Sequence, residues 1–152
     1  MARRPSATIS HPDGFKALLD AMTDAAGESA LRQAAVAGAR VIHEEVRLRA
    51  PTGPKVHMRG GKEYPPGTLK KNIIIFYDER ESVTPQHQVY GVTIGRDAFY
   101  GRIVEDGHRI EHGDSRTAAH PFFRPGVDAK TVEALKAMTK VMQQKLNKAR
   151  NV

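Results

Sequence analysis

The feature that most constrains the fold is one long amphipathic segment whose apolar face contains unusually small residues. One stripe of small and apolar residues recurs along residues 28–49 (ESALRQAAVAGARVIHEEVRLR). It consists of Leu31, Ala34, Ala35, Gly38, Val41, Ile42 and Val46. Recurrence every three or four positions predicts an amphipathic helix, and Pro51 ends it because the residue before a proline avoids helical geometry. A stripe rich in Ala and Gly allows close approach, so we expect this helix to pack tightly against a sheet or another helix.

Two segments in the middle of the chain predict a strand pair. NIIIFYDE (residues 72–79) is β-branched and aromatic, and HQVYGVTIG (residues 87–95) alternates its side chains with a period of two. The polar connection RESVTPQ contains Pro85, which suits a turn between antiparallel strands. The sequence therefore predicts a small antiparallel sheet after the long helix.

Two shorter helices are predicted on either side of these elements. Asp13 can cap a helix over residues 13–22, whose apolar side chains Phe15, Leu18, Leu19 and Met22 recur at helical spacing. AFYGRIVEDG (residues 98–107) predicts another, with Phe99, Ile103 and Val104 directed inward and Gly107 as its end.

A final amphipathic helix is predicted from a cap at Asp128. One face carries Val132, Leu135, Met138, Met142 and Leu146. Its last turn carries Lys145, Lys148 and Arg150, which are favourable near the negative end of a helix dipole. With helices before and after a small sheet, the expected fold class is α+β.

The length of 152 residues fits one domain with a real core, and we place it at residues 13–148. Residues 1–12 are expected to form a flexible arm and residues 149–152 a short tail. Residues 51–69 are dense in Gly and Pro and are predicted to form a long irregular loop. Loops of this length within a compact domain usually serve a function.

Charge alternates along the chain. Residues 47–71 have a net charge of +6 and residues 72–114 a net charge of −4, within an overall charge of +7. Candidate basic-loop residues for contact with DNA or with a neighbouring subunit are Lys55, Arg59, Lys62, Lys70 and Lys71. Lys and Arg on a Gly-rich loop can neutralise phosphates without reading a sequence, and oppositely charged surfaces can join copies. Both placements of this loop remain open from sequence.

The motifs of common catalytic and metal sites are missing. Zero cysteines exclude disulfides, thiolate metal sites and a Cys nucleophile. His108, Glu111 and His112 lie close together but do not match H-E-x-x-H, and neither G-x-S-x-G nor a P-loop occurs. We therefore predict no enzyme, no catalytic residue, no metal and no cofactor. The chain also contains no uninterrupted apolar stretch long enough to span a membrane.

Four motifs, in order, resemble those of the small neck proteins of long-tailed bacteriophages, which join heads to tails and complete tails. The first is the "Ala-Pro" that ends the long helix, present as Ala50 and Pro51. The second is a "Thr-Gly-x-Leu-x-x-Ser-Ile"-like strand start, matched by Gly67, Leu69 and Ile73, with Asn72 in place of Ser. The third, "Phe/Tyr-Tyr-Ala-x-x-Val-Glu-x-Gly-Thr", is matched by Phe99, Tyr100, Gly101, Val104, Glu105 and Gly107, with His108 in place of Thr. The fourth, "Pro-Phe-Leu-Arg-Pro-Ala", is matched by Pro121, Phe122, Phe123, Arg124, Pro125 and Gly126.

The resemblance covers about residues 14–148 and implies a non-catalytic virion protein. Such proteins form a ring, commonly of six copies, between the portal with its adaptors and the tail tube, around the channel for DNA. The implied partners are further copies, head-closure or adaptor proteins, tail-terminator or tail-tube proteins and non-specifically bound genomic DNA. The implied location is the virion neck or tail, after synthesis in the bacterial cytoplasm.

The resemblance also implies a set of subunit-interface residues: Tyr100, Glu105, Gly107, Phe122, Phe123 and Arg124. We expect one of the two phenylalanines to seal the core, and Arg124 to pair with an acid such as Glu105. Two alternatives stay open. One is a tail-terminator ring, and the other is a small basic nucleic-acid-binding or nuclease-like protein.

Overall fold

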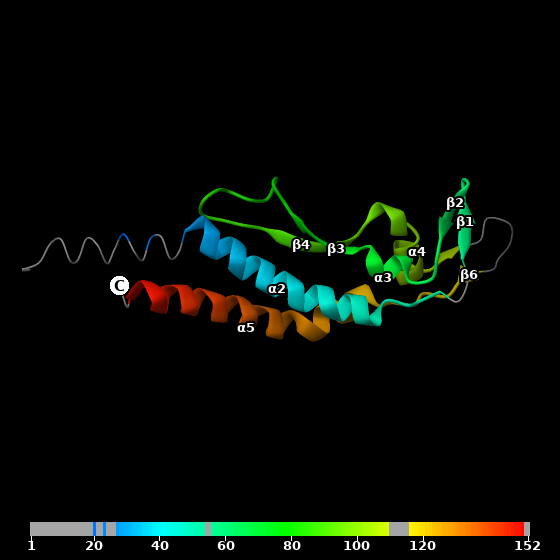
Figure 1. Ribbon diagram of the computed structural model, residues 1–152. Helices are drawn as coiled ribbons and strands as arrows, with labels where there is room; N and C mark the ends of the chain where they lie inside the picture. Colours follow the sequence, from blue (N-terminus) through cyan, green and yellow to red (C-terminus); the bar gives the residue numbers. More distant parts are fainter. Residues whose placement is uncertain (1–19, 21–22, 24–26, 54–55, 110–115, 151–152) are drawn as a thin grey trace, which may run out of the picture.

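The structure, a computed structural model, describes residues 20, 23, 27–53, 56–109 and 116–150. Two long antiparallel helices, α2 (Glu28–Arg49) and α5 (Phe123–Arg150), lie side by side (Figure 1). On the other side of α2 lies a sheet of β3 (Ile73–Tyr77) and β4 (Tyr90–Ile94). The α+β prediction and the bounds of the long helix are confirmed. The predicted helix over residues 13–22 lies largely outside the described residues.

The α2–α5 contact depends on glycines. A Cβ on Gly38 of α2 would lie 2.7 Å from Cγ of Met138, and a Cβ on Gly126 of α5 would lie 2.9 Å from Cγ2 of Val46. Real side-chain carbons do not approach so closely, so a side chain at either position would have to displace Met138 or Val46. The Ala/Gly-rich stripe therefore packs against a second helix, as predicted.

One face of the sheet packs against α2, and the other face is exposed. Ile73 pairs with Ile94, and Ile74 pairs with Thr93, in an antiparallel register. Nε2–H of His43 on α2 donates to the carbonyl oxygen of Ile73 at 2.8 Å, which ties the helix to the start of β3. On the outer face, the ring of Phe76 covers Gly91 on the neighbouring strand.

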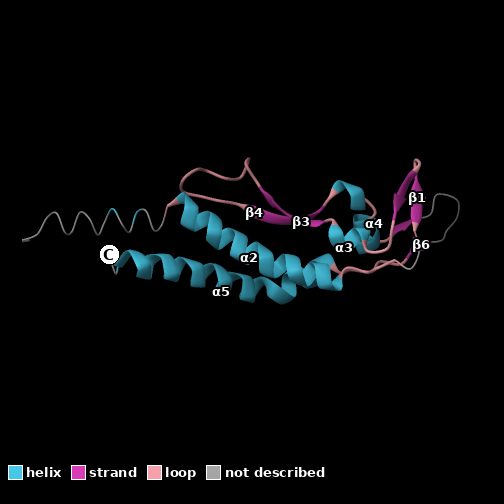
Figure 2. Ribbon diagram, viewed as in Figure 1, coloured by secondary structure: helices cyan, strands magenta, loops and turns pink. Residues whose placement is uncertain are grey.

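The smaller elements gather at one end of the molecule (Figure 2). They are β1 (His57–Arg59), β2 (Lys62–Tyr64), α3 (Thr68–Lys71), the 3₁₀ turn η1 (Arg96–Ala98), α4 (Gly101–Asp106), β5 (His108–Arg109) and β6 (Arg116–Thr117). Among the described residues, no helix has the length and apolar content needed to cross a membrane.

The prediction that most of residues 51–69 lacks regular structure is wrong for residues 57–64. Strands β1 and β2 form a hairpin with Met58 opposite Glu63. The turn consists of Gly60 and Gly61, both with positive φ (56° and 78°). Two consecutive residues of positive φ form the tight turn that suits a two-residue hairpin, so these glycines shape a strand pair instead of preventing one.

Two details of the predicted final helix are wrong. It begins at Phe123 instead of Asp128, because a side chain from α4 caps it earlier. Its predicted apolar face is also displaced, since Val132 is 63% exposed and Leu135 is 56% exposed. The small residues Gly126 and Ala134 make the buried contact with α2 instead.

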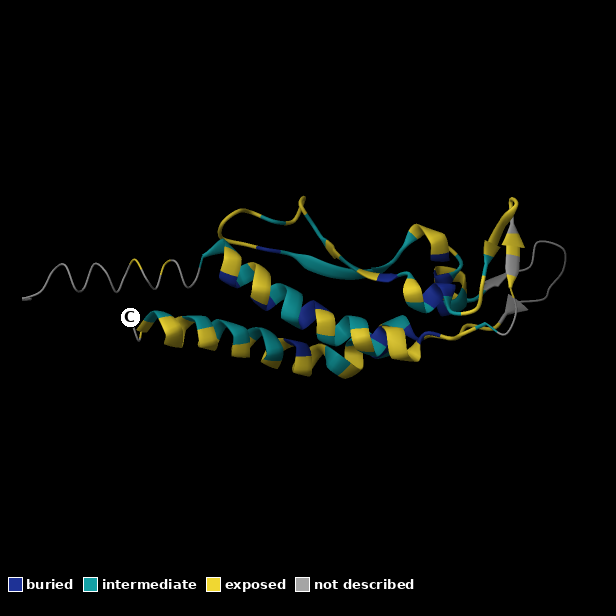
Figure 3. Cartoon of the chain, in the orientation of Figure 1, coloured by how far each residue is buried: buried dark blue, intermediate teal, exposed yellow. Residues whose placement is uncertain are grey.

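The apolar core lies at the end that carries α3 and α4 (Figure 3). Its buried members are Val46, Ala50, Leu69, Ile73, Ala98 and Phe122. The predicted inward direction holds for Val104, which packs against this core, but it is wrong for Phe99 and Ile103, which are 39% and 38% exposed. The opposite end of α2 buries mainly the alanines Ala30, Ala34 and Ala39. Packing is therefore concentrated around α4.

The Gly126 contact generates a stability prediction. Gly126→Val would force branched methyl groups against the backbone of Val46, which is fully buried, so we expect a loss of about 2–3 kcal/mol in the free energy of unfolding. The matched control is Ala129→Val, which places the same side chain at an exposed position of α5 and costs about 0.5 kcal/mol through helix propensity. Urea unfolding followed by circular dichroism measures both. Equal costs would show that α2 and α5 do not touch at Gly126.

Candidate functional site

Helix α4 separates two hollows. The first, a groove of about 540 Å³, is lined by Val92, Thr93, Ile94, Ala98, Phe99, Arg102, Glu105, Asp106, Phe123 and Arg124. The second, a pocket of about 340 Å³, is lined by Pro51, Gly53, Pro65, Pro66, Gly67, Leu69, Tyr100, Val104 and His120. Positions 102, 105 and 106 lie on one face of α4, and positions 100 and 104 on the other. Four of the six predicted interface residues, Tyr100, Glu105, Phe123 and Arg124, therefore line these hollows.

Glu105 is the structural centre of the groove. Its carboxylate accepts three backbone N–H hydrogen bonds, from Phe122 at 2.7 Å, Phe123 at 2.8 Å and Arg124 at 3.0 Å. These donors belong to the first turn of α5, where N–H groups have no partner inside the helix. The next residue, Pro125, has no N–H, and the helical ladder then begins with Gly126 N–H to the Phe122 oxygen. One carboxylate thus satisfies the open end of α5.

The charge of Glu105 suits this position. Burial of the carboxyl group by itself raises its pKa, but the three N–H donors and the positive charge of Arg124 lower it more, so the pKa of Glu105 lies below its usual value. A negative charge at a helix N-terminus also interacts favourably with the helix dipole. Glu105 is therefore ionised at neutral pH although it is only 8% exposed.

Arg124 pairs with a different acid from the one named in the sequence prediction. Its Nη2–H donates to Oδ1 of Asp106 at 2.7 Å, whereas its backbone N–H is what reaches Glu105. The guanidinium is 75% exposed, so this ion pair adds little stability by itself. Its exposure at the rim of the groove leaves it accessible to another protein.

The two neighbouring phenylalanines have different environments. Phe122 is 3% exposed and belongs to the core, which confirms that one of the pair seals it. Phe123 is half-buried and lines the groove, with its ring edge-on to Phe122 at a centroid distance of 6.4 Å. Phe123 and the 39%-exposed Phe99 supply the apolar surface of the groove.

On the far side of α4, Tyr100 and His120 line the proline-rich pocket. Burial raises the pKa of the Tyr100 hydroxyl above its usual value, opposed by hydrogen bonds with Leu69 and Thr68. The backbone N–H of His120 donates to the Val104 oxygen at 2.8 Å. Gly107 ends α4, as predicted, with a φ of 68°, a conformation that favours glycine.

The predicted basic residues whose side chains the structure describes lie on two different elements. Lys62, on β2, forms an ion pair with Asp97 of η1. Lys70 and Lys71 lie on α3. Lys55 lies outside the described residues, as does the side chain of Arg59.

Among the described residues, no group of three or more His, Asp or Glu side chains is arranged to hold a metal ion. Glu111 and His112, two of the three residues of the metal hypothesis, lie outside that part of the chain. The groove itself combines exposed aromatic rings with charged groups, an arrangement typical of a protein contact surface.

Sequence reasoning missed Arg102 and Asp106 as groove residues and His120 as part of the pocket. Arg102 and Asp106 are four residues apart on the same face of α4 as Glu105. That spacing was available from the sequence once a helix over residues 98–107 was predicted. The contribution of His120 depends on how the chain returns to α4, and no local pattern carries this information.

Comparison with known proteins gives one family. A profile for the family described as "Bacteriophage HK97-gp10, putative tail-component" matches residues 13–107, which is more than half of the chain. No curated protein matches the chain. No solved structure matches it either.

The Glu105 cap predicts a specific dependence of stability on pH. Because the folded-state pKa of Glu105 is depressed, its contribution is complete above the usual carboxyl value of 4.5 and is lost as the pH falls through the folded-state pKa. At pH 7 we expect Glu105→Gln to cost about 1.5–3 kcal/mol, since a neutral amide replaces one of the two accepting oxygens with a donor. Below pH 4 this difference should shrink toward zero.

Urea unfolding of both proteins between pH 3 and pH 7 measures this difference. Asp106→Asn is the matched control, because it removes the adjacent, largely exposed carboxylate and should cost well under 1 kcal/mol. A cost for Glu105→Gln that stays constant from pH 7 to pH 3 would contradict an ionised cap.

Proposed function

The chain belongs to the HK97 gp10-like family of bacteriophage tail components, and from this premise we propose that it is a ring-forming protein of the head–tail junction. In this role it completes the neck between the portal with its adaptors and the tail tube, and DNA passes through the ring. It acts as a structural protein without catalysis, and its location is the virion.

The groove beside α4 is the observation that carries the proposal. A groove that joins subunits needs apolar anchors surrounded by charged groups, and Phe99 and Phe123 lie there beside Arg102, Asp106 and Arg124. Its floor is fixed, because Glu105 locks α4 to the start of α5. We therefore propose that the groove receives an adjacent subunit of the virion, with Phe123 and Arg124 in direct contact.

The other exposed apolar groups support an assembled state. Ile74 (43% exposed) and Phe76 (38%) lie on the outer face of the sheet, away from α2. A two-stranded sheet with an apolar outer face gains stability when another surface covers it. Large exposed apolar side chains thus occur on the sheet as well as near α4, which fits a chain with neighbours on more than one side.

The first test of the proposal is electron microscopy of particles made without this protein. We expect DNA-filled heads and finished tails that fail to join, because the neck is incomplete. Tails of uneven length would instead favour the tail-terminator role, since a terminator stops growth of the tail tube. Normal joined particles would end the proposal.

A second prediction concerns the groove directly. Arg102→Glu reverses an exposed charge on α4 inside the groove, and we expect at least a tenfold loss of joined particles with unchanged unfolding behaviour. Arg96→Glu is the matched control, because Arg96 is also exposed but does not line the groove. Plaque titre and particle counts measure the effect. If both variants assemble like the wild type, the groove is not a subunit contact.

A further inference from the structure

The second half of α5 carries charge of one sign. Residues 134–150 contain five basic residues and no acid: Lys136, Lys140, Lys145, Lys148 and Arg150. Within the described part of the chain, none of these five forms an ion pair. The acid that comes just before them, Glu133, already pairs with Lys130 at 2.6 Å. The positive charge of this half-helix is therefore not neutralised by the described residues.

Three of these cations lie on one face of the helix. Lys136, Lys140, Gln143, Asn147 and Arg150 occupy positions i, i+4, i+7, i+11 and i+14, the spacing of a single stripe along a helix, and all five are exposed. We call these five residues the α5 stripe. Each of their side chains can donate hydrogen bonds, and none of them is acidic or apolar. At 1.5 Å per residue, the stripe is about 21 Å long.

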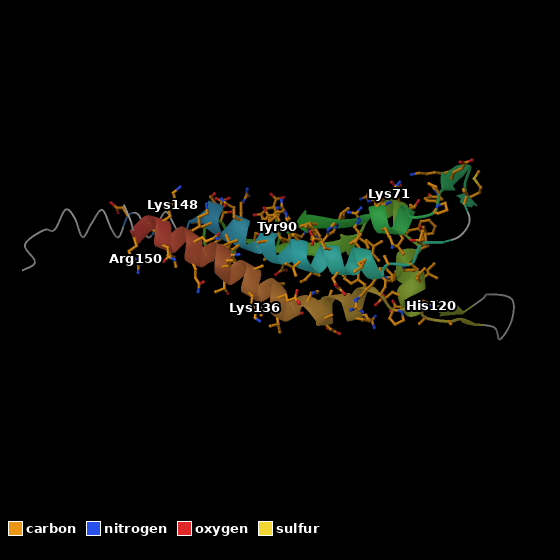
Figure 4. The ribbon with its side chains drawn as sticks, turned by 60° about the horizontal axis from the view of Figure 1, so that its bottom comes forward. Lys71, Tyr90, His120, Lys136, Lys148 and Arg150 are labelled. Atoms are coloured by element: carbon orange, nitrogen blue, oxygen red, sulfur yellow. The ribbon has the colours of Figure 1, made fainter. Side chains whose placement is uncertain are left out.

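The α5 stripe faces away from the rest of the molecule. Ala134 is buried and Met138 lies against α2, so these two residues mark the side of α5 that touches α2. Lys136 and Lys140 follow them by two residues each, which places them about 200° around the helix. Figure 4 shows Lys136 and Arg150 projecting from α5 away from α2. In Figure 1, no described element covers that side of α5.

The fold itself does not account for these charges. A cation in the last turn of a helix interacts favourably with the helix dipole, which explains Arg150, but this effect falls off within one turn. Lys136 and Lys140 lie 14 and 10 residues before the last residue of α5, Arg150. They are also four residues apart, a spacing at which like charges destabilise a helix. We therefore looked for a partner outside the chain that uses the charge.

The chemistry of the α5 stripe fits a nucleic acid better than a protein or a membrane. Protein interfaces use apolar anchors and are poor in Lys, whereas the stripe has two lysines and no apolar residue. Helices that lie on anionic membranes insert an apolar face, which the stripe lacks. Phosphates of a DNA backbone need only positive charge and hydrogen-bond donors. A row of about 21 Å passes about six phosphates of one strand of duplex DNA.

The other surfaces of the molecule fit the same orientation. The exposed apolar side chains Ile74 and Phe76 belong to the sheet, which lies on the opposite side of α2 from α5 (Figure 1). An apolar face suits a protein neighbour and not DNA. The basic loop was the DNA contact expected from the sequence, but its Lys62 already pairs with Asp97. The α5 stripe has no such pair within the described residues.

We propose that the α5 stripe contacts the phosphates of the DNA that passes through the ring, with α5 on the wall of the channel. Each copy contributes three cations, Lys136, Lys140 and Arg150, and reads no base sequence. Contacts of this kind allow a protein to slide along DNA, so they are compatible with passage of the genome. This inference rests on the proposed function, because the chain surrounds DNA only in that role.

DNA binding by the purified full-length protein is the first test. We expect equal affinities for two duplexes of unrelated sequence, measured by fluorescence anisotropy. Lys136→Gln with Lys140→Gln should weaken binding by about tenfold or more at about 50 mM salt. It should also reduce the slope of log K against log salt by about 1.8, since each lost phosphate contact removes about 0.9. The matched control, Arg40→Gln with Arg47→Gln, removes two exposed cations of α2 and should keep the wild-type slope.

Three outcomes of this test would overturn the proposal. The first is a double lysine variant that binds DNA like the wild type. The second is an equal loss in the α2 control, which would show that DNA responds to total charge alone. The third is a lysine variant that binds DNA normally but enters particles poorly, which would assign the α5 stripe to a contact with an acidic protein.

A crosslinking experiment tests the contact inside the particle. Because the sequence has no cysteine, Gln143→Cys introduces a single thiol into the α5 stripe and keeps all of its charges. Labelled with a photoactivatable aryl azide and assembled into joined, DNA-filled particles, this variant should form links to DNA on illumination. Gln33→Cys, at an exposed position of α2, is the control, and Met58→Cys tests the basic loop.

Links at Met58→Cys without links at Gln143→Cys would overturn the proposal in favour of the basic loop. Links that are no more frequent at Gln143→Cys than at Gln33→Cys would also overturn it.

The two proposals fail in different ways. Particles that join normally without the protein would remove the proposed function. Particles that require the protein, but in which Gln143→Cys forms no link to DNA, would remove only this inference.

Discussion

The hydrogen bonds from the first turn of α5 to Glu105 are the interaction on which the arrangement of the molecule depends. They connect residues 17 to 19 positions apart and fix where α5 begins. Gly126 then lies two residues beyond Arg124, the last of the three donors, where it meets Val46 of α2. A helix that began at Asp128 would lack this turn, so the cap and the helix contact form one unit. Phe122 enters the core from the same turn.

This unit gives the molecule two unlike ends. Around α4, the core contains large apolar side chains such as those of Phe122, Leu69 and Ile73. Toward the start of α2, the buried residues are mostly alanines. Buried apolar area stabilises by about 25 cal/mol per Å², so alanines contribute much less than leucines would. The well-packed end can therefore present a fixed surface, while the other end has little side-chain volume of its own and leaves its helices open to a neighbour.

Much of the fold was predictable because its signals are local. The bounds of α2 follow from apolar periodicity and Pro51, and the β3–β4 pair follows from β-branched residues on either side of a polar turn. The start of α5 was not predictable, because its cap is a carboxylate from another helix. The face of α5 was assigned to its largest apolar residues, whereas the tight contact at Gly126 selected small ones. Of the site, Phe122 and Gly107 carried local signals, but the acid that pairs with Arg124 depends on tertiary geometry.

The two-stranded sheet also bears on the order of events during assembly. Within the described residues, β3 pairs with β4 alone, so each strand keeps one edge of backbone N–H and C=O groups without a strand partner. Such edges can form backbone hydrogen bonds with any extended chain nearby. The exposed side chains of Ile74 and Phe76 beside them would stabilise such a non-native pairing. We therefore expect a free copy to aggregate at high concentration. In the proposed role, a neighbouring protein that covers these edges would protect the protein from such pairing.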